Sequence, residues 1–502
     1  MRKSVTETFE TTPFRLAVIG AGPAGVYAAE TLMRSEQVTS GRLAVEVDLF
    51  DALPAPFGLI RYGVAPDHPR IKGIIRALHR ILGRGDMRFF GNVVFGRDIT
   101  LEDLREHYDG VVFSTGALKD AQLNIPGIDL DGSYGAADFV AWYDGNPDYP
   151  RTWPLDHESV GVIGNGNVAL DVARMLSKSG DELLKTEIPA NVYLGKQDSK
   201  ITDVHVFGRR GPAQTKFTPL EARELAHPQG VQVVMDPRDM EQITDAEWEK
   251  IRADKRTDQI VRTFEGWLAD QQKREESGEQ PTDAHGGEVK VRLHMHFWHR
   301  PVEVLGSGEK DEDGQPTGHV TGMRFERTAF DEHEQLIGTG EYVDYELGQV
   351  YRAVGYFGSE LADVPYNADR GVIHNTGGRV TDAEGAVQSG LYANGWIKRG
   401  PVGLIGATKS DALETVTHML EDIESGALTP CADRSADSVV RMLEDRGIEY
   451  TDWDGWMQLH DHEVALGAAE QDADGNARPS VKVVDRDEMV RVSREKKADA
   501  SA

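Results

Sequence analysis

Two stretches of the chain share one pattern: a short apolar run, a glycine-rich turn, and a segment rich in alanine and leucine. The first is RLAVIGAGPAGVYAAETLMR, where residues 16–19 form the apolar run. The second is SVGVIGNGNVALDVARMLSK, where residues 160–163 form it. A buried strand, a tight turn and a helix are the elements that such a pattern predicts. We therefore expect two strand–turn–helix units, far apart in the chain.

Further apolar runs predict the remainder of doubly wound sheets. Residues 108–117 and 348–356 have the pattern of buried strands that end in small residues, and 289–305 alternates as strands do. The charged stretch 249–279 predicts a surface helix that leads into a loop. Beyond about residue 471 there is no convincing periodicity, so we expect a loosely attached tail.

The small residues in the two turns have a physical role in binding a dinucleotide. The first glycine permits a tight turn, the second lets the backbone approach a pyrophosphate, and the third small residue lets the helix pack closely on the strand. The pyrophosphate then lies at the positive end of the helix. The positions are Gly20, Gly22 and Gly25 in the first unit and Gly164, Gly166 and Ala169 in the second.

The two units differ at the end of the next strand. In LAVEVDLFDALP the strand ends at Asp51, whose carboxylate can accept both hydroxyls of an unphosphorylated ribose, as in FAD or NAD. In DVHVFGRR the strand ends in Arg209 and Arg210, which can bind a 2′-phosphate that a carboxylate would repel. The second unit is therefore predicted to select NADP(H). The insert 181–200 lengthens the distance in sequence between Ala169 of the glycine-rich turn and Arg209 at the strand end. We expect a helix extension or loop there.

Composition narrows the classes of protein. The 502 residues are 39% hydrophobic, with no apolar stretch long enough to span a bilayer, so we expect a soluble cytoplasmic protein of several domains. The net charge of −29 argues against nucleic acid or anionic membrane as a partner. Cys431 is the only cysteine, which excludes a disulfide reductase and an internal iron–sulfur cluster. No metal site is predicted.

Several longer motifs resemble the adrenodoxin-reductase-like ferredoxin–NADP(+) reductases, flavoproteins related in fold to glutathione reductase. The resemblance runs to about residue 470. Its specific pieces are GAGPAG, FGLIRYGVAPDHPRIK, FFGNVVFGRDI, NIPG, GNGNVALDVAR, GRRGP, LEARE and GWIKRGPVGLIG. The last of these carries four glycines, which allow the backbone to approach a ligand closely.

The resemblance implies which residues contact each cofactor. On the FAD side these are the turn residues Gly20, Gly22, Ala24 and Gly25, together with Asp51, Leu59, Phe95, Trp396, Gly403, Leu404 and Ile405. On the NADP side they are Asn165, Gly166, Asn167, Val168, Arg209, Arg210 and Glu221, and Gly403 lies near the nicotinamide.

Two titratable residues in these motifs are candidates for catalytic roles. The resemblance places His68, in APDHP, and Glu224, in LEARE, near flavin and nicotinamide, where they could tune proton handling. Hydride transfer itself needs no protein acid or base, and His68 could equally fix the turn between two prolines. Asp171 is interpreted as a charge at the helix start or a structural partner.

The predicted fold is α/β, with two Rossmann-like three-layer nucleotide-binding domains and the NADP domain inserted in a split FAD domain. The expected boundaries are 1–117 and 362–470 for the FAD domain, 118–361 for the NADP domain and 471–502 for the tail. The predicted function is electron transfer between NADPH and a ferredoxin through FAD. We expect a monomer that binds the iron–sulfur protein transiently.

Two other functions are compatible with two nucleotide sites. One is an NADPH-dependent flavin monooxygenase, against which the absence of an FxGxxxHxxxW segment counts; the other is a redox-inactive FAD-binding subunit. A basic stripe on a predicted helix, formed by Lys72, Arg76, Arg80 and Arg84, is a candidate docking surface for an acidic ferredoxin. A solvated helix face is its alternative.

Overall fold

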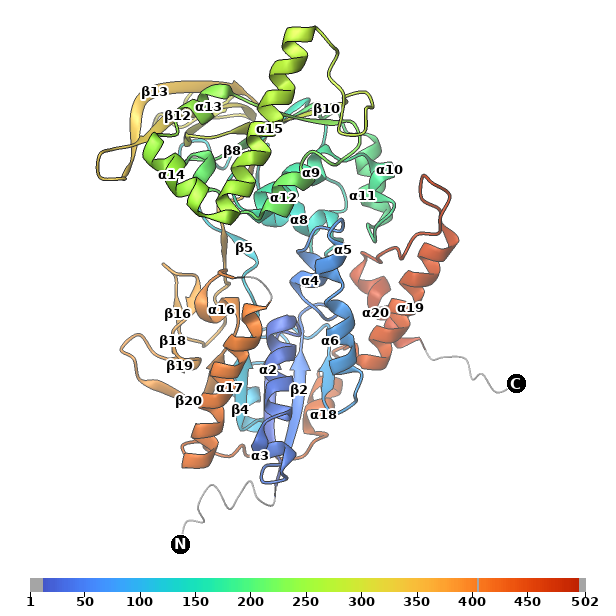
Figure 1. Ribbon diagram of the computed structural model, residues 1–502. Helices are drawn as coiled ribbons and strands as arrows, with labels where there is room; N and C mark the ends of the chain where they lie inside the picture. Colours follow the sequence, from blue (N-terminus) through green and yellow to red (C-terminus); the bar gives the residue numbers. More distant parts are fainter. Residues whose placement is uncertain (1–11, 404–405, 496–502) are drawn as a thin grey trace.

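The computed structural model describes residues 12–403 and 406–495, which form two α/β lobes, drawn one above the other in Figure 1. The lower lobe is built on a seven-stranded sheet of order β18-β19-β20-β4-β1-β2-β3. Strands β3, β2, β1, β4 and β20 run parallel, and β19 and β18 are antiparallel additions. The strands are β1 (Phe14–Ile19), β2 (Val45–Phe50), β3 (Arg88–Phe90), β4 (Gly110–Phe113), β18 (Asn375–Thr376), β19 (Arg379–Thr381) and β20 (Val387–Ala393).

The upper lobe is built on a six-stranded parallel sheet of order β6-β14-β7-β8-β10-β9. Its strands are β6 (Ser133–Gly135), β7 (Ser159–Ile163), β8 (Asp203–Phe207), β9 (Val231–Met235), β10 (Val291–His296) and β14 (Gln349–Arg352). An antiparallel three-stranded sheet adds β11 (His299–Gly306), β12 (Val320–Phe330) and β13 (Leu336–Glu346). In the main sheet of each lobe the strand that precedes a glycine-rich turn, β1 or β7, has a neighbouring strand on both sides. Open α/β sheets bind ligands at the carboxyl ends of their strands, where the strand order reverses.

Helices cover the two sheets. The lower lobe has α2 (Pro23–Met33), α3 (Glu36–Thr39), α7 (Leu101–His107), α16 (Trp396–Arg399) and α17 (Ala407–Ser425), with α2 packed on α17. The upper lobe has α8 (Ala136–Tyr143), α9 (Asn167–Ser177), α10 (Gly180–Leu183), α11 (Ala190–Gln197), α12 (Pro219–Glu224), α13 (Pro237–Glu241), α14 (Asp245–Ala253) and α15 (Lys255–Ser277). Within the part of the chain that the structure describes, none of the helices has the length and apolar character needed to cross a bilayer.

Three features connect the lobes. The chain passes between them twice, and the two passages pair as an antiparallel ribbon of β5 (Lys119–Asp120) and β15 (Tyr356–Phe357). A loop of the lower lobe, residues 57–72 with α4 (Leu59–Tyr62) and α5 (Pro69–Lys72), inserts Ala65 into the apolar core of the upper lobe. The third feature is a C-terminal segment, residues 478–486, which has hydrogen bonds to both lobes. The helix α6 (Ile75–Leu82) follows the loop, and the short ribbon of β16 (Tyr366–Asn367) and β17 (Val372–Ile373) lies in the lower lobe.

The C-terminal part forms α18 (Ser438–Asp445), α19 (Trp453–Ala469) and α20 (Arg486–Arg494), with α19 and α20 beside α4 to α6 in Figure 1. The expectation of a loosely attached tail is wrong for residues 477–494. Met489 and Val492 belong to the apolar core of the lower lobe, and Lys482 is only 4% exposed. Residues 478–485 form no helix or strand and contact both lobes, whereas α20 packs on the lower lobe, so the segment has no single repeating pattern.

The α/β fold is confirmed, and the predicted strands lie where the apolar runs placed them. The stretch 249–279 is mostly α15, and the insert 181–200 contains α10 and α11, which explains the long spacing before Arg209. The domain boundaries stay a prediction.

Candidate active site

The first glycine turn connects β1 to α2 and leaves no room for side chains. Gly20 has φ of +106°, and a Cβ there would lie 2.5 Å from the Ser114 carbonyl oxygen. A Cβ at Gly25 would lie 1.9 Å from the Gly20 carbonyl oxygen, so only glycine lets α2 pack this closely on the strand. Gly22 caps α2 without a side-chain hydrogen bond, which leaves the first N–H groups of the helix available to an anion.

Asp51 lies directly after β2 and faces this turn. Its Oδ2 accepts from the Ala21 N–H at 2.8 Å and its Oδ1 from the Leu53 N–H at 2.9 Å. Burial raises the pKa of Asp51 to about 6, while the two backbone donors act in the opposite direction. Each oxygen of the Asp51 carboxylate keeps a second lone pair that can accept a hydrogen bond. Ribose hydroxyls that donate to these oxygens would favour the charged form of Asp51.

Polar atoms around the first turn lack partners within the described chain. The hydroxyls of Ser114 and Thr115 are buried and make no hydrogen bond. Opposite the turn, Gly58 has φ of +48°, and a Cβ on it would lie 3.1 Å from the Gly22 Cα. Buried polar groups are normally paired, so the two hydroxyls without partners suggest a polar ligand. Together with the two facing glycines, which leave space beside the backbone, they fit a dinucleotide such as FAD.

The GWIKRG motif lies against the same turn. The Asn394 Nδ2 donates to the Ala24 carbonyl oxygen at 2.8 Å, and a Cβ at Gly395 would meet the Ala24 Cβ at 2.6 Å. Trp396 begins α16 and stacks with Tyr356, with ring centroids 6.4 Å apart. Strands β20 and β4 bring this motif to the glycine turn from the other end of the chain.

The remaining predicted FAD-side residues belong to other parts of the lower lobe. Leu59 begins α4, and Phe95 packs edge-on against Phe113 at 5.4 Å between ring centroids. Gly403 is exposed, with φ of +87°. Leu404 and Ile405 lie outside the described residues.

The second glycine turn has the same construction. Gly164 has φ of +144°, and a Cβ there would lie 2.2 Å from the Ala353 carbonyl oxygen. A Cβ at Gly166 would have no described atom within 4 Å, so the space above the start of α9 is open. The side-chain oxygens of Asn165 and Asn167 are buried without a partner among the described residues. This turn therefore also fits a dinucleotide, with Val168 in the first turn of α9.

The two arginines after β8 are free cations. Arg209 and Arg210 are both exposed, and neither guanidinium has a hydrogen-bond or ion-pair partner in residues 12–403 and 406–495. Their backbones are fixed, because the Thr328 hydroxyl donates to the Arg209 carbonyl oxygen at 2.8 Å and the Trp298 N–H to that of Arg210 at 3.2 Å. Unpaired guanidiniums on a fixed backbone are suited to binding a phosphate.

Glu221 has a local structural function. Its carboxylate accepts from the Thr218 N–H at 2.8 Å and completes a capping box at the start of α12. Burial raises its pKa, helped by the charge of Asp171. The structure thus accounts for Glu221 without a ligand, although it lies on the helix that carries Glu224.

His68 lies in an ion network that joins the loop 57–72 to helices of the upper lobe. Its Nε2 is 2.8 Å from Asp171 Oδ1 on α9, and its Nδ1 is 3.6 Å from Glu224 Oε2 on α12. Burial by itself would lower the pKa of His68, but the hydrogen bond to Asp171 and its charge outweigh burial and raise it. The two predicted catalytic residues are therefore neighbours.

Two members of this network were not predicted as site residues. Arg174 is buried and donates to both carboxylate oxygens of Asp67, at 2.5 and 2.9 Å, and to Asp171 at 2.9 Å. Burial alone would raise the pKa of Asp67, but Arg174 and Lys178 hold it well below its usual range. Asp67 and Arg174 both lie in motifs that carry the family resemblance, Asp67 in APDHP and Arg174 at the end of GNGNVALDVAR, so the motifs could have drawn attention to them. Their pairing could not be predicted, because the two residues lie far apart in the chain.

The basic stripe is only partly a surface feature. Lys72 is 8% exposed and contacts Asp144 and Glu187, so its predicted place on the stripe is wrong. Arg84 is paired with Glu30 and Asp86. Arg76 and Arg80, on α6, are the cations of the stripe that remain without a carboxylate partner in the described chain. The predicted long helix is broken at Gly73 into α5 and α6.

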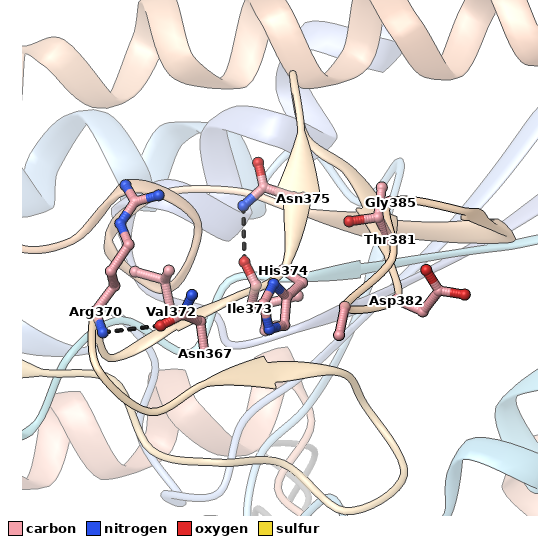
Figure 2. Close-up of a pocket in the computed structure, with 10 residues that line it drawn as sticks. Asn367, Arg370, Val372, Ile373, His374, Asn375, Thr381, Asp382 and Gly385 are labelled. Carbon is pink, nitrogen blue, oxygen red and sulfur yellow. Dashed lines mark hydrogen bonds between the residues drawn. The ribbon is translucent and has the colours of Figure 1, made fainter.

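Two other groupings lie away from the predicted residues. A hollow of about 140 Å³ is lined by Arg370, His374, Asn375 and neighbouring residues of β17 to β19, drawn as sticks in Figure 2. None of the predicted site residues lines it. In the upper lobe, side-chain atoms of Asp203, His205 and His294 lie within 4.8 Å of one another. The Asp203 carboxylate already forms an ion pair with Arg292 at 2.9 Å, so its negative charge is balanced without a metal ion.

Comparisons with known proteins agree with this geometry. Residues 14–255 match the family model described as pyridine nucleotide-disulphide oxidoreductase. The chain is 34% identical to NADPH-ferredoxin reductase FprA of Mycobacterium tuberculosis, over 96% of this chain and 99% of that protein. It is 35% identical to human mitochondrial NADPH:adrenodoxin oxidoreductase, over 97% and 93%. The solved structure of Mycobacterium tuberculosis FprA in complex with NADPH superposes with a TM-score of 0.81, at 34% identity, covering 96% of this chain and 100% of that one.

Proposed function

Since this chain belongs to the family of NADPH-ferredoxin reductases and NADPH:adrenodoxin oxidoreductases, we propose that it passes electrons between NADPH and a ferredoxin-type iron–sulfur protein through FAD. FAD supplies the chemistry that links the two, because flavin takes a hydride from a nicotinamide and releases electrons singly. The chain's residues supply binding, orientation and charge.

The observation that carries this proposal is the difference between two otherwise matching turns. One is followed by a carboxylate at Asp51, and the other by the guanidiniums of Arg209 and Arg210, which have no partner among the described residues. A ribose with free hydroxyls suits the first site, and a 2′-phosphate suits the second. The loop 57–72, which carries Leu59 and His68, reaches from the first site to the helices of the second.

We assign cofactor binding to the residues that the sequence predicts for each site. On the FAD side these are Gly20, Gly22, Ala24, Gly25, Asp51, Leu59, Phe95, Trp396, Gly403, Leu404 and Ile405. On the NADP side they are Asn165, Gly166, Asn167, Val168, Arg209 and Arg210, with Glu221 shaping α12 beside them.

His68 and Glu224 are assigned to proton handling beside the cofactors. The raised pKa of His68 favours the protonated imidazole, held at Nε2 by Asp171. Glu224 Oε2 is buried, makes no hydrogen bond within the described chain, and lies 3.6 Å from Nδ1. The pair could therefore move a proton between imidazole and carboxylate as charge develops nearby.

The proposal extends to the partner and the setting. We propose that the chain acts as a monomer in the cytoplasm and binds its iron–sulfur partner transiently. The strongly acidic composition, with a net charge of −29, supports a dissolved protein, and the free cations Arg76 and Arg80 offer a surface to an acidic partner.

Anaerobic spectroscopy tests the proposal. The purified protein should carry one FAD and be yellow, and NADPH should bleach it in a single rapid phase, with NADH far slower. A protein that binds FAD but is not bleached by NADPH would be the redox-inactive subunit instead. Bleaching followed by oxygen-dependent hydroxylation of a substrate would favour the monooxygenase.

A further inference from the structure

The C-terminal segment 478–486 runs along the junction of the two lobes. On the lower-lobe side, the Val483 N–H donates to Glu463 Oε1 at 2.9 Å, and Glu463 is bound by both Nη atoms of Arg61 from α4. On the upper-lobe side, Val484 packs so closely on Gly145 that a Cβ there would lie 2.9 Å from Val484 Cγ1. The segment thus contacts both lobes within two residues.

Lys482 is a buried cation of this segment that binds both lobes with one ammonium group. Its Nζ donates to the Arg61 carbonyl oxygen at 2.6 Å and to the Asp144 carbonyl oxygen at 3.0 Å. It also lies 3.3 Å from Asp144 Oδ1 and 3.0 Å from Glu187 Oε1. Arg61 belongs to the loop 57–72, whereas Asp144 and Glu187 belong to the upper lobe.

A second lysine completes a neutral buried cluster. The Lys72 Nζ lies 3.1 Å from Asp144 Oδ1 and 2.8 Å from Glu187 Oε1, so two ammonium groups share two carboxylates. Lys72 ends α5, and the loop before it carries both Leu59 and His68. Removing one lysine would leave an uncompensated carboxylate between the lobes, which is costly where water is excluded.

Arginines on either side extend the junction. Arg478 is 3% exposed and donates to the Ile188 carbonyl oxygen of the upper lobe at 2.5 Å. Arg486 binds Asp148 at 2.6 Å and Asn92 Oδ1 at 2.6 Å, one from each lobe. Cations at both ends and in the middle of the segment therefore bind the upper lobe. Two of them, Lys482 and Arg486, also bind lower-lobe atoms outside their own segment.

We propose that residues 478–486 are a strap that fixes the orientation of the two lobes, and that Lys482 is a positioning residue for hydride transfer. This rests on the proposed function, in which the hydrogen and both electrons move together from the nicotinamide of one lobe to the flavin of the other. Such a transfer needs the reacting atoms about 3–3.5 Å apart, and a displacement of about 1 Å costs roughly a hundredfold in rate. Lys482 acts at a distance, through the loop 57–72 that it holds against Asp144.

The test compares Lys482→Met with Lys185→Met in the full-length, FAD-loaded protein. Lys185 is a matched control, because its exposed ion pair with Asp474 also joins the upper lobe to the C-terminal region. Two quantities are measured: hydrogen exchange of residues 57–72 and 478–486, and the rate of flavin reduction per bound FAD at saturating NADPH. For Lys482→Met we expect faster exchange in both segments and a reduction rate lowered about tenfold or more. FAD content and NADP+ affinity should stay within about twofold, and Lys185→Met should match the unaltered protein.

If hydrogen exchange of the two segments is unchanged in Lys482→Met, residues 478–486 are not a strap. If exchange is faster but the rate of flavin reduction per bound FAD is unchanged, Lys482 is not a positioning residue. A variant that is merely less stable would lose FAD but keep its rate per bound FAD, which is also a contradiction. If Lys482→Met does not fold, Glu187→Gln replaces it, with the same readouts interpreted in the same way. If NADPH fails to reduce the unaltered protein, the proposed function fails, while hydrogen exchange still decides the strap.

Discussion

At the scale of single residues, charge at the two strand ends distinguishes the two proposed nucleotide sites. Asp51 is held by two backbone N–H groups, whereas Arg209 and Arg210 have exposed guanidiniums with no partner in the described chain. The cations are therefore available to a ligand without first breaking an ion pair. A 2′-phosphate is the part of NADPH that NADH lacks.

Replacing both Arg209 and Arg210 with alanine should weaken the binding of NADPH much more than the binding of NADH. A hydrogen bond to a charged group contributes about 1.5–3 kcal/mol, so each arginine should account for about a tenfold to hundredfold rise in KM for NADPH. The KM for NADH should change by less than about threefold. Steady-state kinetics with both nucleotides measure this, and equal losses for the two would remove the assignment.

The pKa of His68 predicts a pH-dependent contribution to stability. Because its pKa is raised in the folded state by Asp171, the stabilisation is complete below the unfolded value near 6.5 and is lost as pH rises through the folded value. Arg174 lies 2.7 Å from His68 Nε2 and its charge lowers the pKa, the charge of Asp67 raises the pKa, and Glu224 lies 3.6 Å from Nδ1. The Tm difference between the unaltered protein and His68→Gln should therefore be largest near pH 6 and shrink toward pH 9. A difference that grows with pH would contradict the assigned ion network.

At the scale of elements, α4 and α19 are joined by a buried ion pair. Arg61 donates to both oxygens of Glu463, at 3.0 and 2.6 Å, and both side chains are almost fully buried. Glu463→Ala would leave the guanidinium unpaired, which costs about 3–5 kcal/mol of unfolding free energy. The exposed pair of Arg324 and Asp344 is the control, and Asp344→Ala should cost less than about 1 kcal/mol. Chemical denaturation of both variants measures this; equal losses would contradict it.

The helix α6 is the element that offers a docking surface. Arg76 and Arg80 on it have no carboxylate partner in the described residues, whereas Lys72 is buried and Arg84 is paired. Reversing both free charges to glutamate should slow association with an acidic ferredoxin about tenfold at low salt and flatten its salt dependence. NADPH-to-ferricyanide activity should persist, and Arg105→Glu on α7 is the control. Unaltered ferredoxin kinetics at low ionic strength would place docking elsewhere.

Local elements could be predicted from the sequence because their signals are local. The apolar run before Gly20 and the alanine-rich stretch after it specify β1 and α2 within one short segment. The partners of Lys72 could not be predicted in this way, because Asp144 and Glu187 lie far from it in the chain. Helical spacing placed Lys72 on an exposed stripe, but tertiary contacts buried it. For the same reason the sequence predicts a loose tail where the C-terminal segment contacts both lobes.

At the scale of the whole molecule, the proposed hydride transfer requires that the two lobes keep the two cofactor sites at a fixed distance and orientation. The paired crossings β5 and β15, the loop 57–72 and the strap 478–486 all join one lobe to the other. The loop and the strap meet at Arg61, whose carbonyl oxygen binds Lys482. In the proposed function each turn binds its own nucleotide, whereas electron transfer needs both lobes in a fixed orientation.

In the proposed function NADPH gives two electrons to the flavin as one hydride, and the flavin passes them one at a time to an iron–sulfur protein. The direct measurement is anaerobic: a limiting amount of NADPH is added to the FAD-loaded protein with excess oxidised ferredoxin, and reduced ferredoxin is counted by its absorbance. Because one hydride carries two electrons, we expect two reduced ferredoxins for each NADPH consumed, and none when the protein is omitted. NADPH that bleaches the flavin while ferredoxin stays oxidised, across a panel of acidic ferredoxins, would contradict it.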